Sequence, residues 1–258
     1  MRTDWTALPA TVTTKIAERV GGTRITPSST GDHAEIAATV GGPHTKVFVK
    51  AASSDLGVRS LRYELLVSEA VDRSYSPAVE WHFETDGWLV VGFEQLDGPH
   101  ADLSPGSRHL DLLAAVVDDL SRTPALGSTW FTPATRLGFS HPVAEGQMLV
   151  HTDLNPANLI VTSSGLRVVD WAYATKAAPW LELALLAQWL IGSGHTPEQA
   201  DKWLTQFPAW GTTDPEAIDD LASRSASKWS AKAHGSTDKW IRDLADWTGR
   251  WAAYRAER

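Results

Sequence analysis

The sequence predicts a mixed α/β (α+β) fold of two lobes: an N-terminal lobe with an antiparallel sheet and one helix, and a mainly helical C-terminal lobe. Short β-type runs separated by turn residues fill the first part of the chain. Helical spacings of apolar residues dominate after residue 100. Acid, glycine and proline cluster between these parts, at residues 97–99, so we expect the lobes at residues 1–96 and 97–258.

The elements of the first lobe are predicted from the spacing of apolar residues and from the proline and glycine residues that begin or end each element. A helix over 8–22 precedes the sheet, because Pro9 suits a first turn and Gly21 a C-terminal stop. Apolar positions near helical spacing over 58–73 predict the helix that packs on the sheet. Alternating runs and a strong hairpin signal, "TDG", predict the strands. These strands are 23–27, 34–40, 45–51, 78–84 and 88–96.

The second lobe is predicted from longer apolar patterns. A stripe of apolar residues with steps of four and three near the C-terminus indicates one buried helix face rather than a ligand cage. Its members are Trp240, Leu244, Trp247, Trp251 and Tyr254. A β island at 150–175 interrupts the helices. The predicted helices are 108–122, 180–190, 197–207 and the tail from Pro215.

Composition excludes several classes of protein. The net charge of -8 argues against a general nucleic-acid binder, and the absence of cysteine excludes thiolate nucleophiles and cysteine-zinc sites. The most apolar stretch, 178–194, is too short for a membrane span and contains Glu182 and Gln188. The N-terminus lacks the apolar core of a signal peptide. We therefore expect a cytoplasmic protein without a membrane partner.

Polar residues gather in "HTDLNPAN" and at the end of the strand that follows it. Asp153 and Asn158 lie five apart around Pro156, a spacing that predicts a loop turning both side chains into one site. Asp170 ends the apolar run "LRVVD". Such an oxygen-rich set favours magnesium, which bridges phosphates. The alternative is structural: loop capping by Asp153 and Asn158, with Asp170 capping the strand end.

The pattern H-x-D-x-x-x-x-N, followed by an aspartate at a strand end, resembles the catalytic and metal loops of the aminoglycoside phosphotransferase family, whose fold is protein-kinase-like. The resemblance implies that Asp153 orients or deprotonates the acceptor hydroxyl and so contacts the substrate. It implies that Asn158 and Asp170 hold Mg²⁺ on the nucleotide phosphates, and that His151 braces the loop.

The resemblance extends upstream to the nucleotide. Lys50 ends the alternating run "KVFVK", where it would reach the α- and β-phosphates of ATP. Glu64, on the predicted helix, is its expected partner, and Glu69 competes for that role.

The run "VVGFEQLDG" resembles the hinge of the family, which pairs adenine with backbone groups. Phe93 would guard the back of the pocket, and the backbones of Glu94 and Leu96 would bind adenine. The alternative is an ordinary strand between the lobes.

The chain also departs from the family pattern. Thr152 stands where a glycine is usual, and Glu182 stands where an aspartate is usual. Residues 29–32, the expected cover of the phosphates, contain a single glycine. The segment between Asp170 and the helix at Trp180 is too short for the activation segment of a protein kinase. A protein substrate is therefore not expected.

These observations predict an ATP-dependent, Mg²⁺-assisted O-phosphotransferase acting on a hydroxyl of a small cationic molecule, such as an aminoglycoside-like antibiotic or a related metabolite. The resemblance implies that carboxylates of the C-terminal helices hold substrate ammonium groups, and Asp219 and Asp220 are candidates by their location. Two alternatives stay open: a metabolic kinase for a choline-like or sugar-like compound, and a non-catalytic nucleotide-binding pseudokinase.

Overall fold

The structure is a computed structural model that describes residues 3–28, 34–43, 45–127 and 130–258. The chain forms two compact units. The first consists of Met1–Pro99 and Ile160–Ala172, and the second of His100–Leu159 and Tyr173–Arg258. Ile160–Ala172 thus belongs to the first unit, whereas the boundary expected at residue 97 assigns it to the C-terminal lobe.

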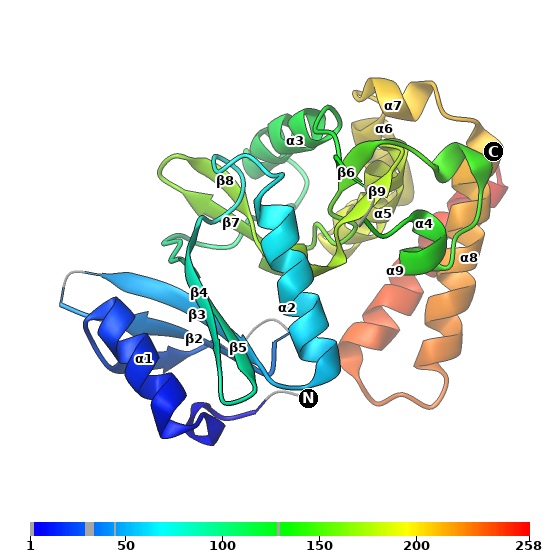
Figure 1. Ribbon diagram of the computed structural model, residues 1–258. Coiled ribbons are helices and arrows are strands. Elements are labelled where there is room, and N and C mark those ends of the chain that lie inside the picture. The colour runs from blue at the N-terminus through cyan, green and yellow to red at the C-terminus, as the bar shows by residue number, and fades with distance from the viewer. Residues whose placement is uncertain (1–2, 29–33, 44, 128–129) are drawn as a thin grey trace. The chain divides into compact units, whose positions relative to one another are not determined.

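The first unit is built on a five-stranded antiparallel sheet of order β1-β2-β3-β5-β4 (Figure 1). Asp86 and Gly87 join β4 to β5 with positive φ angles of 49° and 76°. Positive φ at both central residues matches the twist of a two-residue hairpin, so "TDG" forms the turn it predicts. The strands are β1 (Arg24–Pro27), β2 (Ile36–Gly41), β3 (Lys46–Ala52), β4 (Val79–Thr85) and β5 (Trp88–Glu94).

Helices α1 (Ala10–Val20) and α2 (Asp55–Ser68) cover the two faces of this sheet (Figure 1). Successive side chains of a strand point to opposite faces. Val49 of β3 therefore packs in the cluster that contains the apolar face of α1, whereas Ala52 packs in the cluster of α2. The alternation that predicted the strands thus also sets which residues face α2.

Helix α2 begins three residues before the predicted start at residue 58. The Ser54 hydroxyl accepts a hydrogen bond from the Gly57 amide at 3.2 Å and caps the helix. The Glu35 carboxylate in turn accepts a hydrogen bond from the Ser54 amide at 2.7 Å. A side-chain cap extends the helix N-terminally because it satisfies amides that have no partner within the helix.

A second hairpin consists of β7 (Leu159–Thr162) and β8 (Gly165–Val168). It forms hydrogen bonds with the segment before β4 and with the segment after β5. The Val161 amide donates to the Pro99 carbonyl at 2.9 Å, and the Val168 amide donates to the Tyr75 carbonyl at 2.6 Å. These bonds explain why residues so late in the sequence belong to the first unit.

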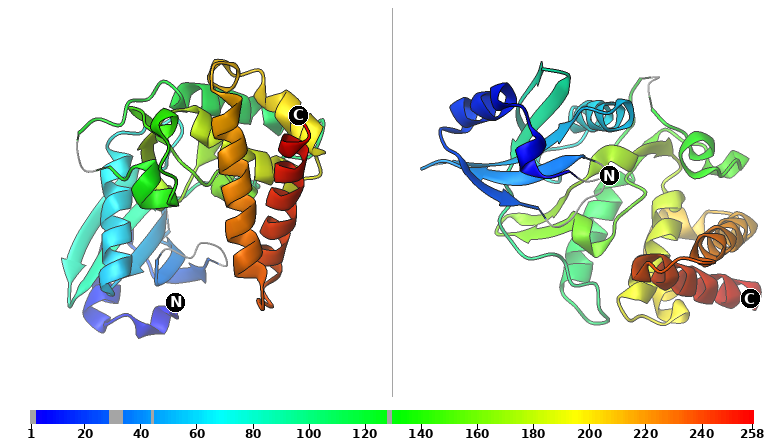
Figure 2. Two further views of the ribbon diagram at one scale, coloured as in Figure 1. Left: turned by 90° about the vertical axis from the view of Figure 1, so that its right-hand side faces the viewer. Right: turned by 90° about the horizontal axis from the view of Figure 1, so that it is seen from below.

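The second unit is mainly helical. Helices α8 and α9 run side by side as an antiparallel pair, so the tail is two helices (Figure 2). Small strands β6 (Met148–Val150) and β9 (Thr175–Ala177) pair with each other. The α-helices are α3 (His109–Leu120), α4 (Pro133–Leu137), α5 (Trp180–Gly192), α6 (Pro197–Leu204), α7 (Pro208–Gly211), α8 (Pro215–Ala233) and α9 (Lys239–Ala256). The short 3-10 helices are η1 (Trp5–Ala7), η2 (Pro142–Ala144), η3 (Pro156–Asn158) and η4 (Trp171–Tyr173).

The predicted apolar stripe of α9 is core over its middle only. Leu244 and Trp251 are buried, and Trp247 packs edge-to-face against Trp189 of α5. Trp240 is 55% exposed, so the first member of the stripe is a surface residue. No helix in the described part of the chain has both the length and the apolar composition needed to cross a membrane.

Candidate active site

Lys50 lies on the central strand β3, on the face that packs against α2, and is 9% exposed. Its Nζ lies 2.8 and 2.9 Å from the two carboxylate oxygens of Glu64 and 3.0 Å from Oδ1 of Asp170. Glu64 comes from the buried face of α2, and Asp170 follows β8. Three elements of the first unit therefore bring one amine and two carboxylates together.

The electrostatics of this cluster favour the charged amine. Burial alone would lower the pKa of Lys50, but the neighbouring Asp170 and Glu64 carboxylates outweigh it and raise that pKa above its ordinary value. Burial raises the pKa of Glu64, and Lys50 opposes that rise. With both carboxylates ionised the cluster carries one excess negative charge, which suits a bound cation.

The structure also separates the two candidate partners of Lys50. Glu64 is buried within α2, whereas Glu69 is exposed at the C-terminal end of that helix. Residues five apart on a helix lie on different faces, so only one of them can face the sheet. The pair formed is Lys50 with Glu64.

Asp170 stands at a sharp turn of the backbone. Its φ is 65°, a left-handed conformation that is uncommon outside glycine. The next residue, Trp171, is buried, and its indole nitrogen donates to the Val168 carbonyl at 2.9 Å. Trp171 thus closes the turn that points Asp170 out of β8.

The predicted hinge residues lie at the end of β5 and just beyond it. Phe93 is buried with its ring centre 5.7 Å from Nζ of Lys50. Glu94 is the last residue of β5, and its carboxylate forms an ion pair with Arg167. Leu96 is buried, and its carbonyl accepts a hydrogen bond from the side-chain amide of Gln95 at 2.9 Å. Adenine binding by the backbones of Glu94 and Leu96 stays a prediction.

In the second unit the loop after β6 turns back on itself. The side-chain amide of Asn158 donates to the Asp153 carbonyl at 2.9 Å and to Asp153 Oδ2 at 3.1 Å. The buried His151 accepts a hydrogen bond from the Asp153 amide at 3.2 Å through Nδ1. The spacing of five therefore brings Asp153 and Asn158 into contact. Because its nitrogen is engaged, Asn158 has the amide oxygen through which to bind a cation.

Glu182, in the first turn of α5, shapes the same loop. Its buried carboxylate accepts hydrogen bonds from the backbone amides of His151 and Thr152, the latter at 3.1 Å. Burial raises the pKa of Glu182 to about 8, although the two amide bonds act against that rise and Asp153 adds to it. Glu182 of α5 therefore braces the loop through its backbone amides.

Thr152 has a φ of 69°, a conformation that is strained for a β-branched residue. Its hydroxyl donates to the Tyr173 carbonyl at 2.9 Å, a bond that glycine would not make. The departure from the glycine of the family pattern thus combines strain with a new hydrogen bond.

The two candidate substrate carboxylates are paired with arginines. Asp219 accepts from Nε of Arg255 at 2.6 Å, and Asp220 accepts from Nε of Arg224 at 2.8 Å. An ammonium group would have to compete with these guanidinium groups. The role of Asp219 and Asp220 in substrate binding stays a prediction.

Two further expectations concern the phosphates and the metal. The segment 29–32, expected to cover the phosphates, lies outside the described residues. Within the described ranges no three or more histidine, aspartate or glutamate side chains gather as a metal site. The donors predicted here are one amide and one carboxylate, a set that fits magnesium with several waters retained.

Arg167 is a residue that our sequence reasoning missed. It is buried on β8 and bonds to Glu94 of the predicted hinge. The available signal was an arginine inside the apolar run "LRVVD", since a buried charge needs a partner.

The profile of the phosphotransferase enzyme family matches residues 78–216, more than half of the chain. A search of curated protein sequences finds no match. A thermostable mutant of aminoglycoside phosphotransferase APH(4)-Ia, in complex with ADP and hygromycin B, is similar in structure: TM-score 0.63, 15% identity, covering 96% of this chain and 98% of that one. The choline kinase LicA from Streptococcus pneumoniae has TM-score 0.64, 15% identity and coverages of 96% and 98%. These similarities confirm the predicted fold class.

Proposed function

Since the chain belongs to the phosphotransferase enzyme family, we propose that it transfers the γ-phosphoryl group of ATP to a hydroxyl of a small cationic molecule. Membership of the family confirms the predicted enzyme class, a phosphotransferase. The observation that carries the finer proposal is the buried Lys50 amine held between Glu64 and Asp170. A buried lysine with a fixed direction is suited to hold phosphate oxygens.

The first unit supplies the nucleotide-binding residues in this proposal. Lys50 binds the α- and β-phosphates, and Glu64 fixes the position of its amine. Asp170 is a magnesium ligand, supported by its carboxylate chemistry and by the excess negative charge of the cluster. The backbones of Glu94 and Leu96 bind adenine beside Phe93.

The second unit supplies the residues of phosphoryl transfer. Asp153 orients the acceptor hydroxyl and accepts its proton, and Asn158 holds the Asp153 carboxylate and binds magnesium through its amide oxygen. His151 and Glu182 brace the loop. Magnesium, when bound, neutralises charge on the phosphates, so the chain itself has mainly to position the reactants.

The acceptor class rests on the similar structures. One of them is an aminoglycoside phosphotransferase and another a choline kinase, at nearly equal TM-scores of 0.63 and 0.64. An aminoglycoside-like acceptor would give the protein a role in antibiotic resistance, and a choline-like acceptor a role in metabolism. Both classes are amines with hydroxyl groups, which supports a cationic acceptor.

The test is an ATP-consumption assay with a panel of acceptors: aminoglycosides, choline, ethanolamine and neutral sugars. We expect Mg²⁺-dependent ATP consumption that rises with one of the amines, and no phosphorylation of casein. Consumption stimulated only by neutral sugars would contradict the cationic acceptor. Magnesium-dependent ATP binding without turnover on any acceptor would favour the pseudokinase alternative.

A further inference from the structure

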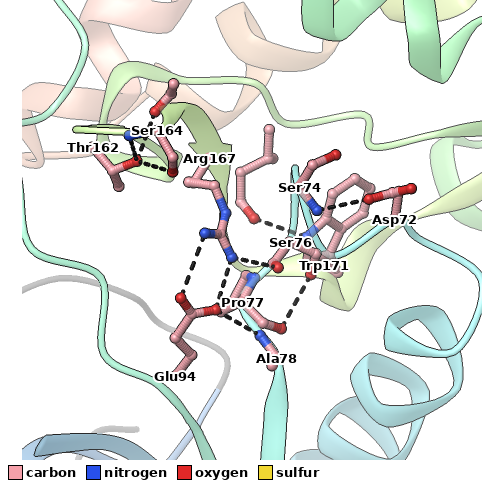
Figure 3. Close-up of polar contacts among 12 residues, drawn as sticks. Asp72, Ser74, Ser76, Pro77, Ala78, Glu94, Thr162, Ser164, Arg167 and Trp171 are labelled. Carbon is pink, nitrogen blue, oxygen red and sulfur yellow. Dashed lines mark hydrogen bonds and ion pairs between the residues drawn. The ribbon is translucent and has the colours of Figure 1, made fainter.

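Arg167 of β8 joins three segments of the first unit (Figure 3). Its Nη2 donates to Oε2 of Glu94 and to the carbonyl oxygen of Ser76, both at 2.8 Å. The same Glu94 carboxylate accepts a hydrogen bond from the Ala78 amide at 3.1 Å. One guanidinium group therefore connects β8, the end of β5 and the chain that leads into β4.

The contact joins two segments that carry proposed nucleotide-binding residues. Glu94 directly follows Phe93 and is one of the two residues whose backbone is proposed to bind adenine. Arg167 lies three residues before Asp170, the proposed magnesium ligand. The contact thus fixes the part of β5 that would bind adenine against the strand that carries Asp170.

Stability alone does not explain a buried arginine here. The Arg167 side chain is 9% exposed and that of Glu94 is 37% exposed. Among the described residues, Nε of Arg167 is buried and makes no hydrogen bond. Burying an incompletely bonded guanidinium is unfavourable, and apolar residues often replace such buried pairs without loss of stability. A role in positioning accounts for a charged residue that packing does not require.

The charge states support a lasting ion pair. Burial would raise the pKa of Glu94, but hydrogen bonds from Arg167 and from the Ala78 amide outweigh that effect and lower it. Arg73 also favours the ionised carboxylate. Glu94 is therefore ionised at neutral pH, and the pair persists over the range in which an ATP-dependent enzyme works.

We propose that Arg167 is a positioning residue for the nucleotide, which holds the adenine-binding end of β5 in register with Asp170. The inference rests on the proposed function. The planar guanidinium group matters, because it reaches the carboxylate and the Ser76 carbonyl from one fixed geometry, whereas an ammonium group is a single point charge.

The experiment is calorimetric titration of the full-length chain with Mg·ATP and, separately, with magnesium tripolyphosphate, which lacks adenine. Arg167→Met is expected to weaken ATP binding about tenfold, and to leave tripolyphosphate binding within about twofold of wild type. Arg167→Lys is expected to recover part of the loss, to about threefold weaker than wild type.

The matched control is Arg62→Met. Arg62 forms an ion pair with Glu84 at 2.7 Å on the same unit, but the two side chains are 58% and 57% exposed. ATP affinity should stay within about twofold of wild type, because exposed pairs contribute little. A general effect of losing one arginine would appear in this variant too.

Unchanged ATP affinity in Arg167→Met, or an equal loss of ATP and tripolyphosphate affinity, would overturn the inference while leaving the proposed function in place. If near-ultraviolet circular dichroism shows that Arg167→Met does not fold, Glu94→Gln is titrated instead and must show the same adenine-selective loss. A wild-type chain that binds no Mg·ATP would overturn the proposed function and, with it, this inference.

Discussion

Each unit buries one glutamate beside its predicted functional residues, but the partners of the two glutamates differ in kind. In the first unit Glu64 faces the Lys50 amine, which also binds Asp170. In the second unit Glu182 accepts hydrogen bonds from the backbone amides of His151 and Thr152. In the first arrangement a counter-charge faces the acidic group, and in the second only backbone amides face it, so that burial raises the pKa of Glu182 to about 8.

The difference has functional consequences. An amine between two carboxylates provides a charged side chain of fixed direction that can meet phosphate oxygens. A carboxylate bound to backbone amides instead fixes the shape of the loop that carries Asp153. This difference agrees with the proposed roles, in which the first unit binds the nucleotide and the second holds Asp153 in place. Charge changes should therefore affect the two sites differently.

The largest effect is expected for Asp153→Asn, which removes the proposed proton acceptor and keeps the shape of the side chain. Phosphoryl transfer should slow by a factor on the order of 10² to 10⁴, because Asn cannot accept the hydroxyl proton. The measurement is steady-state turnover with the acceptor found in the panel. Asp118→Asn serves as control, because Asp118 is a partly exposed residue of α3 that pairs with Arg122 just beyond the helix. Wild-type turnover by Asp153→Asn would remove Asp153 from the mechanism.

Lys50→Met breaks the ion cluster of the first unit. It leaves the buried carboxylate of Glu64 and the 12% exposed carboxylate of Asp170 without their counter-charge, so the free energy of unfolding should fall by about 3–5 kcal/mol. Urea denaturation at pH 7 measures it. Arg62→Met, which breaks the exposed pair, should lower it by less than about 1 kcal/mol. Similar losses of unfolding free energy in both variants would show that the buried cluster contributes no more to stability than the exposed pair.

Glu182 predicts a pH dependence of stability. Its pKa is about 8 in the folded state against an ordinary value of 4.5. Between these values the folded state keeps a proton that the unfolded state has released, so the contribution is present below pH 4.5 and is lost as pH rises through 8.

Urea denaturation of wild type and Glu182→Gln at pH 5, 6.5 and 8 isolates this contribution. As pH rises, wild type should lose about 2–4 kcal/mol relative to the variant, which cannot ionise. A difference that stays constant over this range would mean that Glu182 does not titrate there.

The smallest effect concerns the backbone of the loop at Thr152. Thr152→Ala and Thr152→Gly both lose the hydrogen bond to Tyr173, but only alanine keeps a Cβ at a φ of 69°. Thr152→Gly should be more stable than Thr152→Ala by about 1 kcal/mol in urea denaturation, because a left-handed conformation is unfavourable with a Cβ. Equal stability would show that the loop relaxes in the alanine variant.

Much of the fold was predictable because its sheet is antiparallel and both of its faces are covered by helices. The runs predicted at 45–51 and 88–96 form β3 (Lys46–Ala52) and β5 (Trp88–Glu94). Alternation marks such strands directly, since each face packs against a different helix. The start of α2 was missed because Ser54 and Glu35 fix it, and a cap supported from 19 residues away leaves no local pattern.

The candidate site was predictable only where its residues lie close in sequence. The spacing of Asp153 and Asn158 within one loop predicts their contact. The choice between Glu64 and Glu69 depends on which helix face is buried, which the weak periodicity of α2 does not decide. Arg167 and Glu94 lie 73 residues apart, and their contact follows from how the β7–β8 hairpin attaches to the first unit.

The central claim is that the chain binds Mg·ATP through Lys50, Glu64 and Asp170, while Asp153 serves the transfer step. The most direct test is calorimetric titration of ATP into wild type, Asp170→Asn and Asp153→Asn, with and without a magnesium chelator. We predict that chelator sharply weakens wild-type binding, that Asp170→Asn weakens it at least about tenfold, and that Asp153→Asn stays within about threefold of wild type. Equal affinity with and without magnesium, or losses of the same size in the two variants, would contradict this division of roles.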